Sequence, residues 1–262
     1  MKLSVLMENT ARSPEFFREH GLSLFVETEN RRILFDMGQT DRFAENAARM
    51  HVPLETAELA VLSHGHYDHG GGLKRFLQLN RHAPVYVSPY AFEPHFSGPE
   101  KDIGLDRSLQ GEPRLLSGRA FPKDSQLELT DCAGLEIPFP ADPFGLFTRR
   151  DGKLIPEDFR HEQYLIVHEK GRRIVFSGCS HRGILNIVHW LKPDVLIGGF
   201  HYKKLDPHGE GRETLSEAAR LLLESGAKFY TGHCTGEEQS RFLKEQMGSR
   251  LEILSTGDIL DI

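Results

Sequence analysis

The sequence predicts an α/β fold of four layers, in which two β-sheets pack face to face and helices cover both outer sides. Apolar strands alternate with helical segments in two halves of the chain, and each half contains two strands joined by a short polar turn. The composition is globular, with 39% hydrophobic and 27% charged residues. The 262 residues suit one layered domain that spans residues 1–262.

Individual elements follow from local patterns. Runs rich in Val, Ile, Leu and Phe predict strands, whereas apolar residues three and four positions apart predict helices. In the first half we expect strands at residues 3–7, 22–28, 31–36, 59–62 and 85–87, and helices at 40–50 and 72–79. In the second half we expect strands at residues 164–168, 174–177, 195–197, 228–231 and 251–254, and helices at 183–191, 212–225 and 236–247.

Two segments, 94–124 and 136–160, are rich in Gly and Pro and show little periodicity. Segments of this kind in a compact domain are expected to be long loops. The second segment contains Phe144 and Phe159 among other aromatic residues, which favours a packed and ordered loop. Two interpretations stay open: a small satellite core, or a lid that covers a substrate site.

Charge and hydropathy exclude several classes of protein. The net charge of −6 argues against binding of nucleic acid through bulk charge. No run of about 18 apolar residues predicts a membrane span, and Glu8 interrupts the apolar N-terminal segment too early for a secretory signal. The three cysteines are widely spaced, which favours a reducing cytoplasm over a disulfide framework. We expect a cytoplasmic protein with a small-molecule substrate, no nucleic-acid or membrane partner, and homo-oligomerisation as an option.

The strongest chemical signal is the run Ser-His-Gly-His-Tyr-Asp-His-Gly-Gly-Gly at residues 63–72. It directly follows a predicted buried strand and precedes a predicted helix. His64 and His66 lie two positions apart, so extended backbone places both imidazoles on one side, where they can bind one metal ion. Asp68 and His69 follow the bend and can serve a second ion. Chance alone rarely places four ligand-type side chains in this order at a strand end.

The pattern His-x-His-x-Asp-His after an apolar strand resembles the signature of the metallo-β-lactamase superfamily, and the resemblance extends over nearly the whole chain. It implies a four-layer αββα sandwich with two divalent ions between the sheets, zinc by default and manganese or iron as alternatives. Asp36 resembles the superfamily aspartate that supports the metal-site histidines. A turn cap is the alternative role for Asp36.

Three later strand ends also resemble this family. They read Gly-Cys-Ser-His at 178–181, Gly-Gly-Phe-His at 198–201 and Thr-Gly-His-Cys-Thr-Gly at 231–236. Together they resemble the branch described as dihydropterin-related synthases of the methanopterin pathway. Cys179 stands near the position where many members have a bridging aspartate, so it could be a soft ligand or a buried small residue. The resemblance implies that His233 completes the second site with Asp68 and His69.

The third ligand of the first ion remains open between two histidines. His181 ends a core strand beside the expected bridging position, whereas His161 precedes the strand predicted at 164–168 as the usual third histidine does. His201 is expected to line the pocket, and Lys203 to attract an anionic substrate or to remain a solvated charge. The other histidines considered are expected to be ordinary surface or core residues: His20, His51, His82, His189 and His208.

These residues predict a metal-dependent hydrolase in which a metal-bound hydroxide attacks a small phosphoester, cyclic or diester, or a related anionic substrate. Asp68 is the predicted catalytic residue, because it can orient the nucleophile and move a proton. The first alternative is a dihydropterin-related synthase with a phosphate-bearing substrate. The second alternative is a non-catalytic metal-binding protein.

Overall fold

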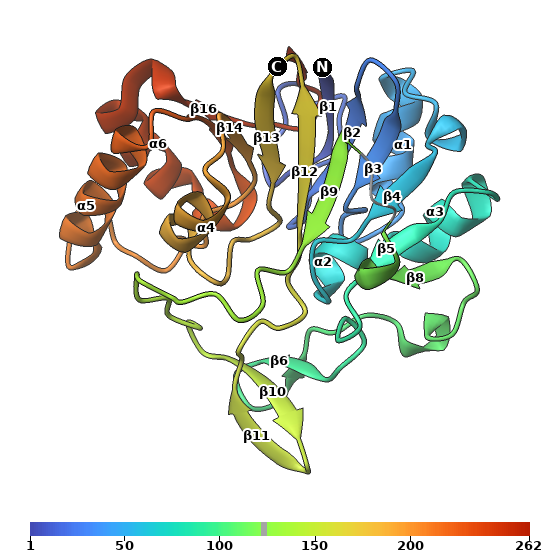
Figure 1. Ribbon diagram of the computed structural model, residues 1–262, viewed down its shortest axis with the longest axis horizontal. Helices are drawn as coiled ribbons and strands as arrows, with labels where there is room; N and C mark the ends of the chain where they lie inside the picture. Colours follow the sequence, from blue (N-terminus) through green and yellow to red (C-terminus); the bar gives the residue numbers. More distant parts are fainter. Residues whose placement is uncertain (122–124) are drawn as a thin grey trace.

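The computed structural model of the chain describes residues 1–121 and 125–262. Two large sheets pack face to face, with helices on both outer sides (Figure 1). This arrangement confirms the predicted four-layer α/β sandwich. Within the described residues, no helix is long and apolar enough to cross a membrane.

The first large sheet has seven strands. The strand order is β17 (Ile259–Asp261), β1 (Lys2–Met7), β2 (Ser23–Glu27), β3 (Arg32–Phe35), β4 (Leu59–Val61), β5 (Val85–Val87) and β8 (Leu115–Ser117). The four strands at one edge, β3, β4, β5 and β8, run parallel. Helices α1 (Arg42–Arg49) and α3 (Leu73–Leu79) cover its outer face, where their apolar side chains join one core.

The second large sheet has six strands, of which β13 to β16 run parallel. The order is β16 (Leu251–Ile253), β15 (Lys228–Thr231), β14 (Val195–Ile197), β13 (Arg172–Phe176), β12 (Tyr164–Glu169) and β9 (Leu127–Thr130). Helices α4 (Ile184–Leu191), α5 (Gly211–Glu224) and α6 (Glu237–Met247) cover its outer face.

Strand side chains alternate between the outer cores and the core between the sheets. In β12, Leu165 and Val167 join the inter-sheet core, whereas Tyr164 and Ile166 pack under the helices. Both faces of each large sheet are therefore buried, which explains why the strands read as continuous apolar runs rather than as strict alternation.

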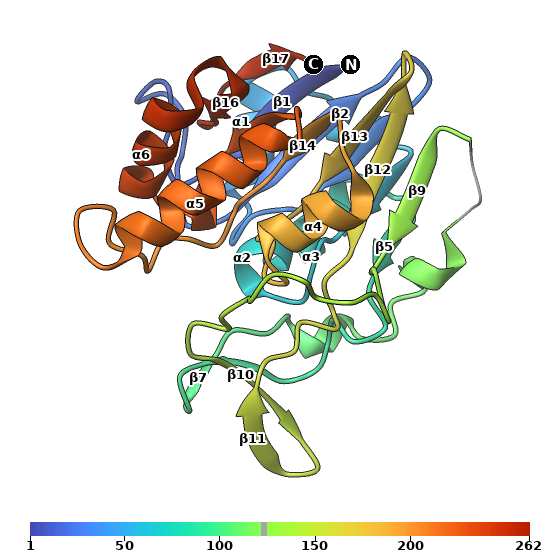
Figure 2. The same cartoon turned by 60° about the vertical axis from the view of Figure 1, so that its left-hand side comes forward.

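The two expected long loops contain strands, so that part of the prediction was wrong. A third, four-stranded sheet consists of β11 (Lys153–Pro156), β10 (Leu146–Arg150), β6 (His95–Ser97) and β7 (Lys101–Asp102). Its hairpin of β10 and β11 lies beyond the ends of the large sheets, opposite the chain termini, in both views (Figures 1 and 2). These strands are short and carry few β-branched residues, and β6 pairs with the distant strand β10, so periodicity did not reveal them. Positions 122–124 of the first segment lie outside the described residues.

Candidate metal centre

The ligand-type residues gather at one end of the inter-sheet core. Loops that follow the carboxyl ends of five strands meet there: β3 supplies Asp36, β4 the run from His64 to His69, and β13, β14 and β15 the later histidines. In the run 63–72, residues Tyr67–Gly70 form the short helix α2. Carboxyl ends of parallel strands are the usual place for ligands in α/β proteins.

The backbone at this end is tightly constrained. Asp36, Ser180, His201 and His233 all have positive φ angles between 48° and 58°. Such left-handed conformations are uncommon outside glycine and cluster at functional sites, where the surrounding structure enforces them. At Gly178, an added Cβ would lie 2.1 Å from the Oγ of Ser63, so only glycine permits this approach of the two sheets.

Asp36 is fully buried and organises two histidines. Its Oδ1 accepts the Ser63 N–H (2.7 Å), and its Oδ2 accepts both the Ser63 hydroxyl (2.7 Å) and Nδ1–H of His69 (2.7 Å). The Ser63 hydroxyl has only one proton, so its contact with Nδ1 of His64 (2.8 Å) requires His64 to donate. Both histidines therefore carry a proton on Nδ1, which leaves Nε2 as the atom that can bind a metal.

His233 is oriented in the same way by a different residue. Its Nδ1–H donates to Oδ1 of Asn9 (2.9 Å), so its Nε2 also faces the centre as a lone pair. The buried Glu8 carboxylate accepts the backbone N–H of His233. Burial raises the pKa of Glu8 above its usual value.

The donor atoms form two groups, and within each group they face one another at distances that suit a metal ion. Nε2 of His64 lies 3.3 Å from Nε2 of His181. Nε2 of His233 lies 3.0 Å from Nε2 of His69 and 3.3 Å from Oδ2 of Asp68. Two nitrogen ligands bound tetrahedrally at about 2.0–2.1 Å lie about 3.3–3.4 Å apart, so the donor set fits two divalent ions.

Cys179 lies between the two groups. Its Sγ is 3.2 Å from Nε2 of His69, and it shares a potential metal-binding group with His64 and His181 as well as one with His69 and His233. Burial raises the pKa of the Cys179 thiol well above its usual value. From its position, the Cys179 sulfur could bind, as a thiolate, a metal ion held by either group.

His66 lies beside the first group but also contacts a second set of histidines. Its ring centroid is 4.6 Å from that of His64, yet its potential ligand group is formed with His95 and His161. Nε2 of each of these three residues is buried without a hydrogen-bond partner.

Hydrogen bonds fix the protons of His161 and His95 in opposite ways. Nδ1 of His161 accepts the backbone N–H of Gly65 (2.8 Å), so a neutral His161 carries its proton on Nε2 and is a donor rather than a ligand there. Nδ1 of His95 bonds the buried Glu157 (2.7 Å) and donates to its carboxylate, so Nε2 of a neutral His95 is an acceptor.

Electrostatics separate the two metal-binding groups. Burial, followed by repulsion from neighbouring imidazoles, holds the pKa of His64 and of His181 well below the usual value. Burial also acts to lower the pKa of His69, but the carboxylates of Asp36 and Asp68 outweigh it and raise this pKa to about 9. Without metal, the first group is therefore neutral near pH 7, whereas His69 is protonated.

The remaining predicted residues lie at the edge of the centre. His201 is half-buried, and its ring centroid is 4.2 Å from that of His181. Lys203 is exposed, and its charge acts on His20. The expectation that His20 is an ordinary residue was wrong, because its Nε2 lies 3.2 Å from Oδ2 of Asp68.

Sequence patterns did not single out four residues of the centre. Glu162 is buried and accepts the backbone N–H of His181 (2.8 Å), and so fixes that loop. His95, Glu157 and Asn9 also support or contact the histidines. A buried acid directly beside a candidate ligand, as in the His161-Glu162 pair, was the signal available in the sequence; Asn9 carried none.

Comparisons with known proteins identify the family of this chain. A model of the metallo-beta-lactamase superfamily matches residues 17–228. A Methanocaldococcus jannaschii protein named 7,8-dihydropterin-6-methyl-4-(beta-D-ribofuranosyl)-aminobenzene-5'-phosphate synthase is 30% identical over 294 residues, covering 99% of this chain and 96% of its own length.

Solved structures show the same fold. A crystal structure described as a metal-dependent hydrolase of the beta-lactamase superfamily has a TM-score of 0.82 and 27% identity, covering 100% of this chain and 99% of that one. A metallo-beta-lactamase fold protein from Bacillus subtilis has a TM-score of 0.59 and 13% identity, covering 99% of both chains, and shares the fold alone. The family resemblance predicted from the histidine motif is thus confirmed: the chain belongs to the metallo-β-lactamase superfamily.

Proposed function

We propose that this protein is a metal-dependent hydrolase that uses two divalent ions, with zinc as the default, on a small phosphoester or related anionic substrate. One observation carries the proposal: two sets of inward-facing donor atoms have separations of 3.0–3.9 Å, and Cys179 lies between the sets. Hydrogen bonds on Nδ1 of His64, His69 and His233 also leave Nε2 of each ring free to bind a metal.

Each residue has a distinct role in this proposal. His64, His66 and His181 would hold one ion, and Asp68, His69 and His233 the other. Bound ions would supply Lewis acidity and lower the pKa of a coordinated water.

Asp68 would also orient the attacking water and accept a hydrogen bond from it. Its carboxylate stays ionised, because its contacts with His69 and His233 lower its pKa against the effect of burial. It also contacts the part-exposed His20.

The test is reconstitution of purified protein with zinc, manganese or iron(II), followed by assay against bis(4-nitrophenyl) phosphate, a lactone and a thioester. We expect metal-dependent cleavage of the phosphodiester. Asp68→Asn keeps the side-chain volume but removes the charge, and should lower the rate by about 10²–10⁴-fold. Bound metal without cleavage of any of these substrates would contradict the hydrolase assignment.

The second candidate is a synthase acting on a phosphate-bearing pterin. The similarity to the named archaeal synthase over nearly its whole length favours it. Release of pyrophosphate upon incubation with a pterin diphosphate and an aromatic amine would identify this activity. Metal binding without either activity would leave a metal-binding protein.

A further inference from the structure

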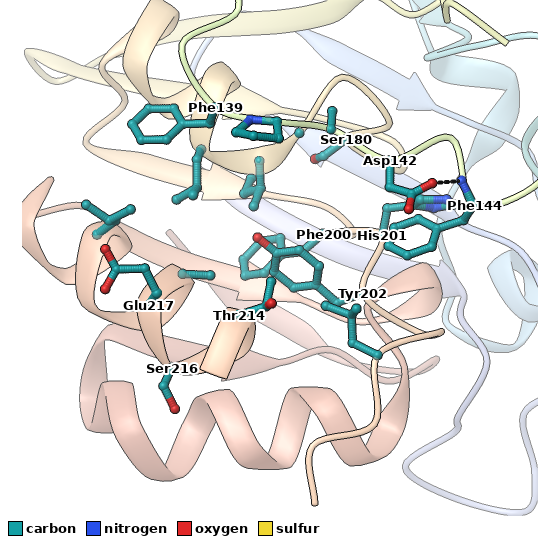
Figure 3. A pocket seen from close by; sticks show the side chains of 18 of the residues that line it. Phe139, Asp142, Phe144, Ser180, Phe200, His201, Tyr202, Thr214, Ser216 and Glu217 are labelled. Atoms are coloured by element: carbon teal, nitrogen blue, oxygen red, sulfur yellow. Dashed lines mark hydrogen bonds between the residues drawn. The ribbon is translucent and has the colours of Figure 1, made fainter. Parts of the chain in front are cut away.

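A pocket of about 1010 Å³ opens next to the metal centre, between α4, α5 and the segment 139–144. Figure 3 shows aromatic side chains facing its interior from both sides. The apolar part of its lining comprises Phe139, Phe144, Leu185, Phe200, Tyr202 and Leu205. The volume suits a ligand of drug size.

The pocket reaches the proposed ligands of the first ion. His181 and His201 belong to its lining, and the ring of Phe144 lies 5.5 Å from that of His201. A substrate whose anionic group rests on the metal centre can therefore extend its remaining part into this pocket without leaving the protein.

The segment that forms one wall is held in place. Asn186 on α4 accepts the backbone N–H of Phe139 (2.9 Å) and donates to the Phe139 carbonyl (2.8 Å). The paired hydrogen bonds fix the backbone beside the aromatic ring. The wall is thus pre-formed, which lowers the ordering cost of binding.

The charged groups of the lining are mainly acidic. The lining contains Asp142, Glu210, Glu213 and Glu217. The guanidinium of Arg220 bonds Glu217 (2.6 Å) and Glu224, and Lys204 near the rim donates to the carbonyl of Phe144. A second anionic group would meet carboxylates here, whereas amino N–H donors would find acceptors.

We propose that this pocket binds an aromatic group with amino substituents, belonging to a substrate whose anionic group occupies the metal centre. The inference rests on the proposed function for the anionic group only. An aryl ring needs to lose only about 55 Å² of apolar surface to gain about tenfold in affinity.

The experiment compares three phosphonates with the zinc-loaded protein by calorimetry: methylphosphonate, 4-aminobenzylphosphonate and 4-carboxybenzylphosphonate. We expect the aminobenzyl compound to bind at least tenfold more tightly than the methyl compound, and the carboxybenzyl compound to lose this advantage. Thr214→Trp places an indole in the pocket from an exposed position of α5, and should abolish the advantage while methylphosphonate binding stays unchanged.

Two further variants sharpen the test. Leu223→Trp introduces the same side chain on the same helix outside the pocket lining, and should retain the wild-type preference. Glu213→Lys should shift the preference toward the carboxybenzyl compound. Equal affinity for methyl and aminobenzyl compounds, or an advantage that survives Thr214→Trp, would overturn the inference.

A probe without an anionic group separates this inference from the proposed function. Binding of 4-methylaniline, followed by ligand-observed NMR, should be weak, independent of metal, and lost in Thr214→Trp. If 4-methylaniline binds so but no phosphonate binds, the pocket assignment stands and the phosphoester function fails. If phosphodiesters are cleaved but 4-methylaniline binding is absent or insensitive to Thr214→Trp, the pocket assignment fails and the function stands.

Discussion

Replacing Asp36 by Asn should lower the affinity for both metal ions, although the Asp36 side chain faces neither of the proposed metal positions. The carboxylate accepts three hydrogen bonds, from the Ser63 N–H, the Ser63 hydroxyl and His69. An amide of the same size offers one oxygen and one NH₂ group, so it cannot accept all three. The consequence depends on which way the amide lies.

If the amide oxygen faces the Ser63 N–H, the NH₂ group faces the Ser63 hydroxyl and Nδ1 of His69. The hydroxyl must then accept, and it turns its own proton toward Nδ1 of His64. Both histidines are driven to carry their proton on Nε2, the atom that would bind metal. In the opposite orientation, the NH₂ group meets the backbone N–H in a fully buried place, which costs about 1–3 kcal/mol.

The magnitude follows from two histidines acting together. Loss of an outer hydrogen-bond partner typically costs about 10–100-fold in metal affinity for each ligand. Two affected ligands give about 10²–10⁴-fold over both ions, or about 2.7–5.5 kcal/mol. Competition against a chromophoric zinc chelator measures this directly, with metal stoichiometry determined on the same samples.

Ser63→Ala is the matched control. It removes the link between Asp36 and His64 but leaves the Asp36–His69 hydrogen bond in place. The ion held by His64 should bind more weakly, and the ion held by His69 should keep nearly its wild-type affinity. If Asp36→Asn binds two equivalents within about threefold of wild type, the assignment of the histidine protons is wrong.

Three further predictions follow from the same network. His181→Ala should lose one equivalent of metal, which metal analysis measures. His161→Ala should keep both equivalents but lose about 1–3 kcal/mol of unfolding free energy, because the Gly65 N–H is left unpaired. Urea unfolding measures this loss. Cys179→Ala should remove the thiolate charge-transfer absorption of the cobalt-substituted protein; an unchanged spectrum would exclude the thiol as a ligand. In the metal-free protein, each buried histidine with a lowered folded pKa contributes stability at higher pH that is lost below about pH 6.5, by about 1.4 kcal/mol per pH unit. His69 acts oppositely: its contribution is complete below about pH 6.5 and is lost as the pH rises to about 9, so the melting temperature of the metal-free protein should be highest near pH 6.5.

The layers of the fold could be predicted because their signal is local. In strands such as β12 and helices such as α5, the apolar pattern lies within the element itself. Both large sheets also bury their two faces. The third sheet could not be predicted in this way. Strand β6 pairs with β10, which lies about fifty residues further along the chain, so its stability comes from contacts that no local pattern contains.

The candidate site divides in a similar manner. The run from His64 to His69 is visible because its residues are close in sequence. The choice between His161 and His181 is not, because it depends on the Gly65 N–H and on the packing of the 178–181 loop against Ser63. His95 was hidden in a segment whose glycines and prolines indicated only a loop. Hydrogen bonds between distant residues, rather than residue type, decide which ring nitrogen is free.

Proton release should distinguish the two metal-binding groups. His64 and His181 have lowered pKa values, so the first ion should displace almost no protons near pH 7. The second group behaves differently, because His69 has a pKa of about 9 and the pKa of the Cys179 thiol is raised by burial. Binding there should release up to about two protons, one from each residue. Zinc titrations in buffers of different ionisation enthalpy measure this number, and Cys179→Ala should lower it by about one. Equal release for both ions in Cys179→Ala, which lacks the thiol proton, would show that the carboxylates of Asp36 and Asp68 do not hold His69 in its protonated form.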